Sequence, residues 1–158
     1  MVTYRPAVPA DAHACIVLRG QTRENAIRAA TLASYGITTE SWAQSIETEH
    51  SFGVVCIDVF RIVGYCFGDS HTGEILVLAL LPQYEGRGIG KTLLSRIATH
   101  LGQVGHERLF LGCSRNPEHR SYGFYRHLGW KATGTADAHG DEVLELSLRV
   151  ESPCRPPP

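Results

Sequence analysis

The sequence lacks the features that mark several classes of protein. None of its apolar runs approaches the ~20 residues that a membrane-spanning helix needs. It has no C-x-x-C pair, no H-E-x-x-H stretch and no cluster of cysteine and histidine, so we predict no metal site. The net charge of −1 provides no broad basic surface, which argues against binding to nucleic acid or to a membrane surface. The amino-terminal stretch MVTYRPAVPADA lacks a signal pattern, and we expect a cytoplasmic protein.

What the chain does contain is typical of one globular domain. Its 158 residues are 43% hydrophobic and 20% charged, which is enough for a substantial core. We place the domain at residues 1–150 and expect the proline-rich segment 151–158 to be disordered. The five cysteines show no paired spacing, and we expect them to be reduced and mostly buried.

Hydrophobic periodicity predicts a mixture of helices and strands in an α/β (α+β) single domain. Residues 9–19 and 42–47 are expected to be helical, and residues 21–33 to extend the first helix or to start another. The continuous apolar run 75–81 is typical of a strand buried on both faces, and Pro82 ends it because proline has no N–H to donate. The other expected elements are strands at 3–6, 51–58, 59–68, 108–113, 130–135 and 142–150, and helices at 89–104 and 119–128.

The segment from Glu85 to Lys91, just after that apolar run, has the composition of a phosphate-binding loop. It carries glycines at 86, 88 and 90, and a helical pattern follows. The first N–H groups of a helix have no partners within the helix and lie at the positive end of its dipole. Glycines let the backbone approach an anion closely. We therefore predict a cradle for phosphate or pyrophosphate; the alternative is a tight turn with no ligand.

Three known loop patterns compete for this segment. A Walker A loop would need its first glycine at position 85, where the chain has Glu85, so a phosphate-binding NTPase is the most distant alternative. A dinucleotide-binding fingerprint needs G-x-G-x-x-G, but the spacing here is G-x-G-x-G. The third pattern, [QR]-x-x-G-x-[GA], is matched at Gly88 and Gly90, with Glu85 in place of the usual glutamine or arginine.

A second motif lies at residues 121–130, which read SYGFYRHLGW. Four of its residues match the pattern A-x-x-F-Y-x-x-x-G-[FW], namely Phe124, Tyr125, Gly129 and Trp130. Ser121 replaces the usual alanine, and alone the stretch would describe a core helix with aromatic anchors and a glycine stop. The two motifs in this order, with one expected strand between them, resemble the GNAT acetyltransferase superfamily. The resemblance covers residues 51–150.

The resemblance implies a mixed, mostly antiparallel central sheet of about six to seven strands with about four helices. In the family, the strand before the loop bulges and splays from the next strand, and the pantetheine arm of the cofactor enters the gap. Those strands are residues 75–81 and 108–113 here. The Leu80 N–H is the implied donor to the thioester oxygen. The implied acetyl-CoA site consists of Leu78, Leu80, Glu85, Gly86, Arg87, Gly88, Ile89, Gly90, Lys91, Asn116 and Tyr125.

The implied reaction is transfer of an acetyl group from acetyl-CoA to a primary amine of a small molecule, by direct attack of the neutral amine. Tyr125 is the implied acid that protonates the departing thiolate. A base must take a proton from the ammonium form; the first candidate is Glu74, at the start of the central strand, and the second is Glu24. Each carboxylate also has an ordinary explanation as a solvated surface group, and a water chain would leave no trace in the sequence.

The acceptor site is implied less directly. In relatives the region around Arg23, Glu24 and Asn25 covers the acceptor, and these polar residues favour a small polar amine; Tyr35 and Trp42 are alternatives that would form an apolar wall. Two other functions stay open: a protein or peptide N-acetyltransferase, and a regulatory acyl-CoA-binding module without turnover. Members often form homodimers, and the alternation of apolar and polar residues in 142–150 predicts an edge strand or a dimer seam.

Overall fold

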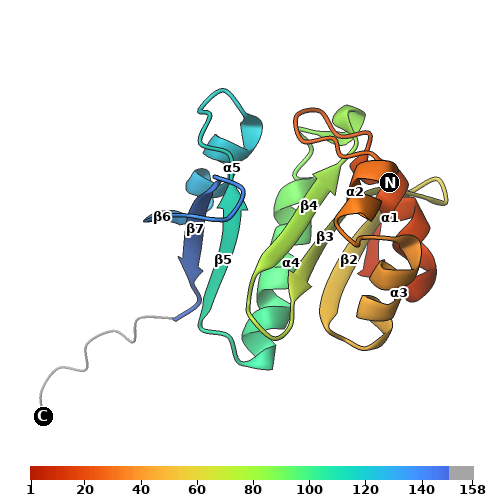
Figure 1. Cartoon of the computed structure of the whole chain (residues 1–158), viewed down its shortest axis with the longest axis horizontal. Coiled ribbons are helices and arrows are strands. Elements are labelled where there is room, and N and C mark those ends of the chain that lie inside the picture. The colour runs from red at the N-terminus through yellow and green to blue at the C-terminus, as the bar shows by residue number, and fades with distance from the viewer. Residues whose placement is uncertain (150–158) are drawn as a thin grey trace, which may run out of the picture.

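The computed structural model describes residues 1–149, and Figure 1 shows two groups of elements beside each other. The strands are β1 (Thr3–Pro6), β2 (Ser51–Asp58), β3 (Arg61–Asp69), β4 (Ile75–Leu80), β5 (Arg108–Cys113), β6 (Lys131–Ala136) and β7 (Glu142–Ser147). The helices are α1 (Ala12–Arg19), α2 (Ala29–Ser34), α3 (Thr39–Glu47), α4 (Ile89–Val104) and α5 (Arg120–His127), with short 3-10 turns at Pro9–Asp11 and Pro82–Tyr84. The strands form two antiparallel sheets, of order β1-β2-β3-β4 and β5-β7-β6.

The four-stranded sheet is covered by helices on both faces. α1 and α3 lie in front of it in Figure 1, and α4 lies behind. Trp42 of α3 packs edge-on against Tyr65 and Phe67 of β3, with ring centroids 5.7 Å and 5.3 Å apart. On the other face, α4 buries the apolar stripe that its periodicity predicts, at Ile89, Leu93, Leu94, Ile97 and Leu101. The central strands are therefore held rigidly between two helical layers.

Local sequence signals explain where several elements begin and end. The Thr38 side chain accepts a hydrogen bond from the Ser41 N–H, and the Ser41 hydroxyl accepts one from the Thr38 N–H, so α3 begins with a reciprocal cap. Gly105 ends α4 with φ of 117°, a backbone conformation that favours glycine. Between β2 and β3 the chain turns at Val59 and Phe60, which makes the expected antiparallel hairpin.

Two expectations about individual segments need correction. The stretch 21–33 does not continue the first helix, because α1 ends at Arg19; a second helix does start there, but only at Ala29. The strand 142–150 is not an edge strand, because β7 pairs with β5 on one side and β6 on the other, and the dimer seam stays a prediction. In α4, Val104 is 51% exposed and lies outside the buried stripe.

The run 75–81 is also not buried on both faces. Leu76 is 47% exposed, and the register shows it as an extra residue, since Val77 pairs with Phe67 and Ile75 with Gly68. A bulge of this kind bends the strand and disrupts its ladder. β4 is thus the bulged last strand of its sheet, as the resemblance implied.

The part of the chain beyond Arg149 lies outside the described residues. It includes Val150, the last residue of the expected strand, and the proline-rich segment 151–158. No helix within residues 1–149 is long and apolar enough to cross a membrane.

Candidate active site

The site is organised around the divergence of β4 from β5. Within residues 1–149 the two sheets are joined by a single parallel bridge, between Glu74 and Phe110, where the Phe110 N–H donates to the Gly73 carbonyl at 3.3 Å. No ladder continues from this bridge along β4 and β5. The neighbouring strands therefore splay apart from one end, as Figure 1 shows.

The main chain of β4 faces this splay with unpaired groups. In an antiparallel pair, successive residues direct their N–H and C=O groups alternately toward and away from the partner. The Leu81 N–H donates to the Val63 carbonyl at 2.9 Å, and the register pairs Gly64 with Leu80. The N–H groups of Leu78 and Leu80 consequently point away from β3, toward β5.

The opposing wall is β5, and its main chain faces the splay in the same way. The Leu148 N–H donates to the Glu107 carbonyl at 2.8 Å, and this alternation turns the main-chain groups of Gly112 away from β7. The Asp137 carboxylate, from the turn between β6 and β7, occupies the space that a side chain at position 112 would need. Because residue 112 is a glycine, the Asp137 carboxylate can pack directly against the main chain of β5.

The loop before α4 has the geometry of an anion cradle. Gly86 and Gly88 have φ of 76° and 79°, and a Cβ at either position would meet no heavy atom within 4 Å. The first helical hydrogen bond runs from the Thr92 N–H to the Gly88 carbonyl at 3.1 Å, which leaves the N–H groups of Ile89, Gly90 and Lys91 free of helical partners. These donors open a helix of 16 residues, whose dipole favours an anion.

The second motif packs directly on this cradle. A Cβ on Gly90 would lie 3.5 Å from the Phe124 ring of α5, so the ring closes over the first turn of α4. Next to Phe124, the Tyr125 ring lies 5.0 Å from the Phe124 ring and 5.9 Å from the Trp130 ring, centroid to centroid. The two motifs recognised in the sequence are therefore parts of one site.

Tyr125 is partly buried and packs against the hydrophobic core. Burial, and then the nearby thiols of Cys66 on β3 and Cys113 on β5, raise the pKa of its phenol above the ordinary value. Part of the side chain nevertheless remains accessible. The phenol is thus protonated at neutral pH, and it is a weaker acid than an ordinary tyrosine.

Glu74 occupies the bridge at the closed end of the splay and is half-buried. Its pKa is raised, first because burial disfavours the charged carboxylate and then because the carboxylates of Asp69 and Asp137 repel it. A raised pKa brings a carboxyl closer to the pH range in which it can accept a proton from a protonated amine.

The remaining predicted donor-site residues are placed less favourably for side-chain contact. Arg87 folds back on the loop, with its guanidinium 5.0 Å from the Tyr84 ring and donating to the Gln83 carbonyl at 3.1 Å. Lys91 is exposed. The Asn116 side-chain oxygen accepts from the Glu118 N–H at 3.0 Å, so this amide is already engaged in the turn, although its NH₂ group and a second lone pair of its oxygen can take other partners.

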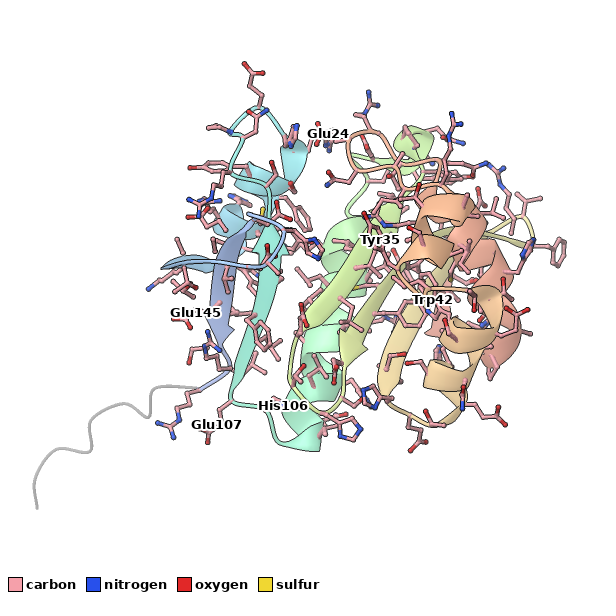
Figure 2. The ribbon with its side chains drawn as sticks, viewed as in Figure 1. Glu24, Tyr35, Trp42, His106, Glu107 and Glu145 are labelled. Carbon is pink, nitrogen blue, oxygen red and sulfur yellow. The ribbon has the colours of Figure 1, made fainter. Side chains whose placement is uncertain are left out.

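Glu85 is bound by two arginines that the sequence did not connect with it. Its carboxylate accepts from Arg23 at 3.0 Å and from Arg120 at 2.9 Å. Glu24 accepts from the backbone N–H of Arg120 at 2.9 Å, at the start of α5. Figure 2 places Glu24 at the end of the molecule where α5 and the loops beside α1 approach each other. Glu24 thus caps a helix in this structure.

Other candidate residues have ordinary structural roles. Trp42 is an aromatic neighbour of the core, and Tyr35 is 66% exposed at the end of α2 (Figure 2). The four cysteines of the described chain are free and buried, as expected. No group of three or more His, Cys, Asp or Glu residues in the described range is arranged to hold a metal ion.

Sequence reasoning missed Asp137 and Arg120. Asp137 lies in a turn where aspartate is common, so its composition carried no functional signal. Arg120 stands beside the second motif but outside its pattern. The only sequence signal was Glu85 itself, a negative residue at a position where the loop pattern usually has glutamine or arginine. Such a carboxylate needs a positively charged partner nearby.

We compared the sequence and the structure with those of known proteins. A family model described as the acetyltransferase (GNAT) family matches residues 23–130. The chain belongs to this family. An uncharacterized N-acetyltransferase of Mycobacterium tuberculosis is 35% identical over 78 residues, which are 48% of this chain and 49% of that protein. The chain thus spans about half the length of the curated relatives it matches.

Solved structures share the GNAT fold over nearly the whole chain. The PaiA N-acetyltransferase of Thermoplasma acidophilum, in complex with coenzyme A, has a TM-score of 0.77 at 21% identity and covers 93% of this chain and 99% of its own. A Salmonella typhimurium protein solved with its cofactor acetyl-CoA has a TM-score of 0.71 at 17% identity, with 98% of both chains covered. The predicted fold class is confirmed, with the sheet divided in two and five helices where about four were expected.

Proposed function

We propose that this GNAT protein transfers an acetyl group from acetyl-CoA to a primary amine of a small molecule, by direct attack within a ternary complex. The observation that carries the proposal is the continuity of two features. The free N–H groups at the start of α4 are joined, by the loop 81–88, to the end of a strand whose Leu78 and Leu80 main chain faces the splay. An extended donor with a pyrophosphate at one end and a thioester at the other fits this order.

The donor site we propose has two parts. The pyrophosphate lies on the loop and the first turn of α4, at Glu85, Gly86, Arg87, Gly88, Ile89, Gly90 and Lys91, with the contacts made mainly by backbone N–H groups. The pantetheine arm lies between β4 and β5, bonded by the main chain of Leu78 and Leu80 and by the Asn116 amide, with Tyr125 near the sulfur. Relatives solved with coenzyme A or acetyl-CoA support the assignment of the donor.

Three groups carry the chemistry in this proposal. Glu74, through a water if the gap requires one, removes a proton from the ammonium form of the acceptor. The free amine attacks the thioester carbonyl, and the Leu80 N–H stabilises the charge that develops on oxygen. The C–S bond breaks, and Tyr125 gives its proton to the departing thiolate.

The acceptor class follows from charge. Asp137 lies against Gly112 on one wall, and its carboxylate contributes, after burial and Asp69, to the raised pKa of Glu74. Carboxylates attract a cationic amine and lower the cost of binding it in the ammonium form. A small cationic amine therefore suits the site.

Calorimetry with acetyl-CoA tests the donor site. Wild type should bind, and Gly88→Glu should abolish binding because it places a negative side chain where the pyrophosphate lies. Gly105→Glu is the matched control: Gly105 ends the same helix, also has positive φ, and has no heavy atom within 4 Å of its Cβ position. No binding by wild type overturns the proposal.

If wild type binds, free thiol release is followed with a panel of small amines and with peptides. Release with small amines supports the acceptor class. Release with peptides alone would assign a protein acetyltransferase instead. Binding without release on either panel would leave the regulatory module.

A further inference from the structure

The segment of residues 20–28 is a loop that is closed at its base. The Ile27 N–H donates to the Arg19 carbonyl at 3.0 Å, and the Arg19 guanidinium donates to the Asn25 carbonyl. Between these ties the tip of the loop projects toward α5, with Glu24 visible there in Figure 2. The contacts at the base fix only the ends of the loop. The position of the tip relative to the cradle loop and α5 therefore depends on the contacts that the tip itself makes.

Two carboxylates hold the tip: Glu24 accepts from the Arg120 backbone N–H at 2.9 Å, and a carboxylate oxygen on the cradle loop joins the tip to its neighbours through side chains. Oε2 of Glu85 accepts from Nε of Arg23 at 3.0 Å and from Nη1 of Arg120 at 2.9 Å. The Glu85 side chain is only 15% exposed, whereas those of the two arginines are 54% and 57% exposed. The partly buried carboxylate thus joins three segments: the loop tip, the cradle and the start of α5.

The chemistry of position 85 matters for this junction. A carboxylate can accept charge-assisted bonds from two guanidiniums at once. An arginine there would repel both, and a glutamine would offer only a neutral carbonyl. The carboxylate also carries a disadvantage, because its negative charge lies on the loop that is to bind an anion.

From this we infer that Glu85 is a positioning residue: it holds the segment 20–28 against the cradle loop and the start of α5, at some expense in acetyl-CoA affinity. The inference rests on the proposed function, which places acetyl-CoA on the cradle. It assigns to Glu85 a role that acts through Arg23 and Arg120. One residue thereby favours the closed position of the segment and disfavours binding of the donor.

The test compares wild type with Glu85→Gln in two assays. Trypsin, with products identified by mass, should cut after Arg23 about threefold to tenfold faster in the variant, because the tip is released. Acetyl-CoA, measured by calorimetry at low salt, should bind about twofold to fivefold more tightly, because a like charge is removed and two guanidiniums are freed. If Glu85 merely supported the structure of the loop, its replacement would speed cleavage and weaken acetyl-CoA binding. Faster cleavage together with tighter binding therefore distinguishes the proposed role.

Two further variants sharpen the comparison. Glu107→Gln removes the carboxylate that pairs with Arg149 at 2.9 Å, at the opposite end of the molecule (Figure 2), and should change neither assay. Arg120→Gln removes one arm of the junction but keeps the cleavage site at Arg23, and should give an intermediate cleavage rate. Thermal unfolding of each variant shows that the fold is retained.

The outcomes separate this inference from the proposed function. Unchanged cleavage after Arg23 in Glu85→Gln, or weaker acetyl-CoA binding, overturns the role of Glu85. If wild type does not bind acetyl-CoA, the proposed function fails, and faster cleavage in the variant without ligand would still establish the junction itself.

Discussion

Glu74 and Phe110 form the one bridge that joins the two sheets within residues 1–149, and the Glu74 carboxyl lies at that junction. The strands separate beyond it, so Glu74 marks the floor of the space into which a thioester and an amine would enter. Its raised pKa arises from partial burial and from two neighbouring carboxylates. The raised pKa suits the Glu74 carboxylate to accept a proton. It also means that ionised Glu74 lowers the stability of the folded state.

Glu74→Gln should lower kcat/KM about 100-fold with the best amine of the panel, the lower range for loss of a general base. A base works in its deprotonated form, so the wild-type rate should fall as the pH drops through the Glu74 pKa. The variant should lose this acidic limb from its pH profile. Retention of the full limb would point to another group or to water as the base.

Asp137→Asn should move the same acidic limb to lower pH. The Asp137 carboxylate is one of the causes of the raised Glu74 pKa, and its removal lets Glu74 ionise more easily. Asparagine keeps the side-chain oxygen that accepts from the N–H groups of His139 and Asp141, so the turn should be preserved. A limb that stays in place would show that Asp137 does not act on the base.

Glu74→Gln should also stabilise the fold at pH 7. Because the folded-state pKa of Glu74 lies above the unfolded value of about 4.3, folding favours the protonated carboxyl. That contribution is fully present below the unfolded pKa and is lost as the pH rises through the folded pKa. Thermal unfolding should give the variant a higher Tm than wild type at pH 7 and little difference near pH 4. A lower Tm at pH 7 would contradict the assigned burial cost.

Tyr125→Phe should lower kcat about 100-fold while leaving acetyl-CoA affinity nearly unchanged, because the phenol acts only when the thiolate departs. Its raised pKa means that no alkaline limb should arise from this residue near neutral pH. Tyr122→Phe, on the same helix, keeps the ring that Arg126 covers at 3.7 Å and serves as the control. Equal activity of both variants would remove Tyr125 from the chemistry.

Cys113→Ala should keep its turnover. The thiol is 3% exposed and its pKa is raised by burial, so little thiolate exists to carry an acyl group. Loss of the buried sulfur should cost roughly 1 kcal/mol of stability. Steady-state rates corrected for the folded fraction check this prediction, and abolished turnover would indicate a covalent intermediate.

The fold was predictable where local signals agreed with long-range packing. The apolar stripe of α4, the cap at Thr38 and the glycine at 105 were enough to place two helices. The exposure of Leu76 did not follow from the apolar run itself, because it results from a bulge in the pairing of β4 with β3; only the resemblance to the family implied that bulge. The central place of β7 depends in the same way on which strands pair, and alternation along one strand does not decide that.

The main-chain geometry of the candidate site was more predictable than its side-chain contacts. The glycines at 86 and 88 and the helical pattern after them predicted a loop that leads into a helix N-terminus, and the structure has that geometry; anion binding there stays a prediction. The partners of Glu85 come from positions 62 residues earlier and 35 residues later, and only folding brings them together. Asp137 reaches the site through a turn between β6 and β7, for which the sequence offered no spatial clue.

Both walls of the splay are formed by peptide groups, at Leu78 and Leu80 on β4 and at Gly112 on β5. A peptide group presents the same donor and acceptor whatever side chain it carries, so the contacts that we propose for acetyl-CoA depend on strand geometry and not on side chains. Under that proposal, substitutions around the acceptor would leave the contacts to the donor intact. The same property would suit this scaffold to directed evolution: libraries at Asp137 and in residues 20–28 would test for new acceptors while the proposed donor site is kept unchanged.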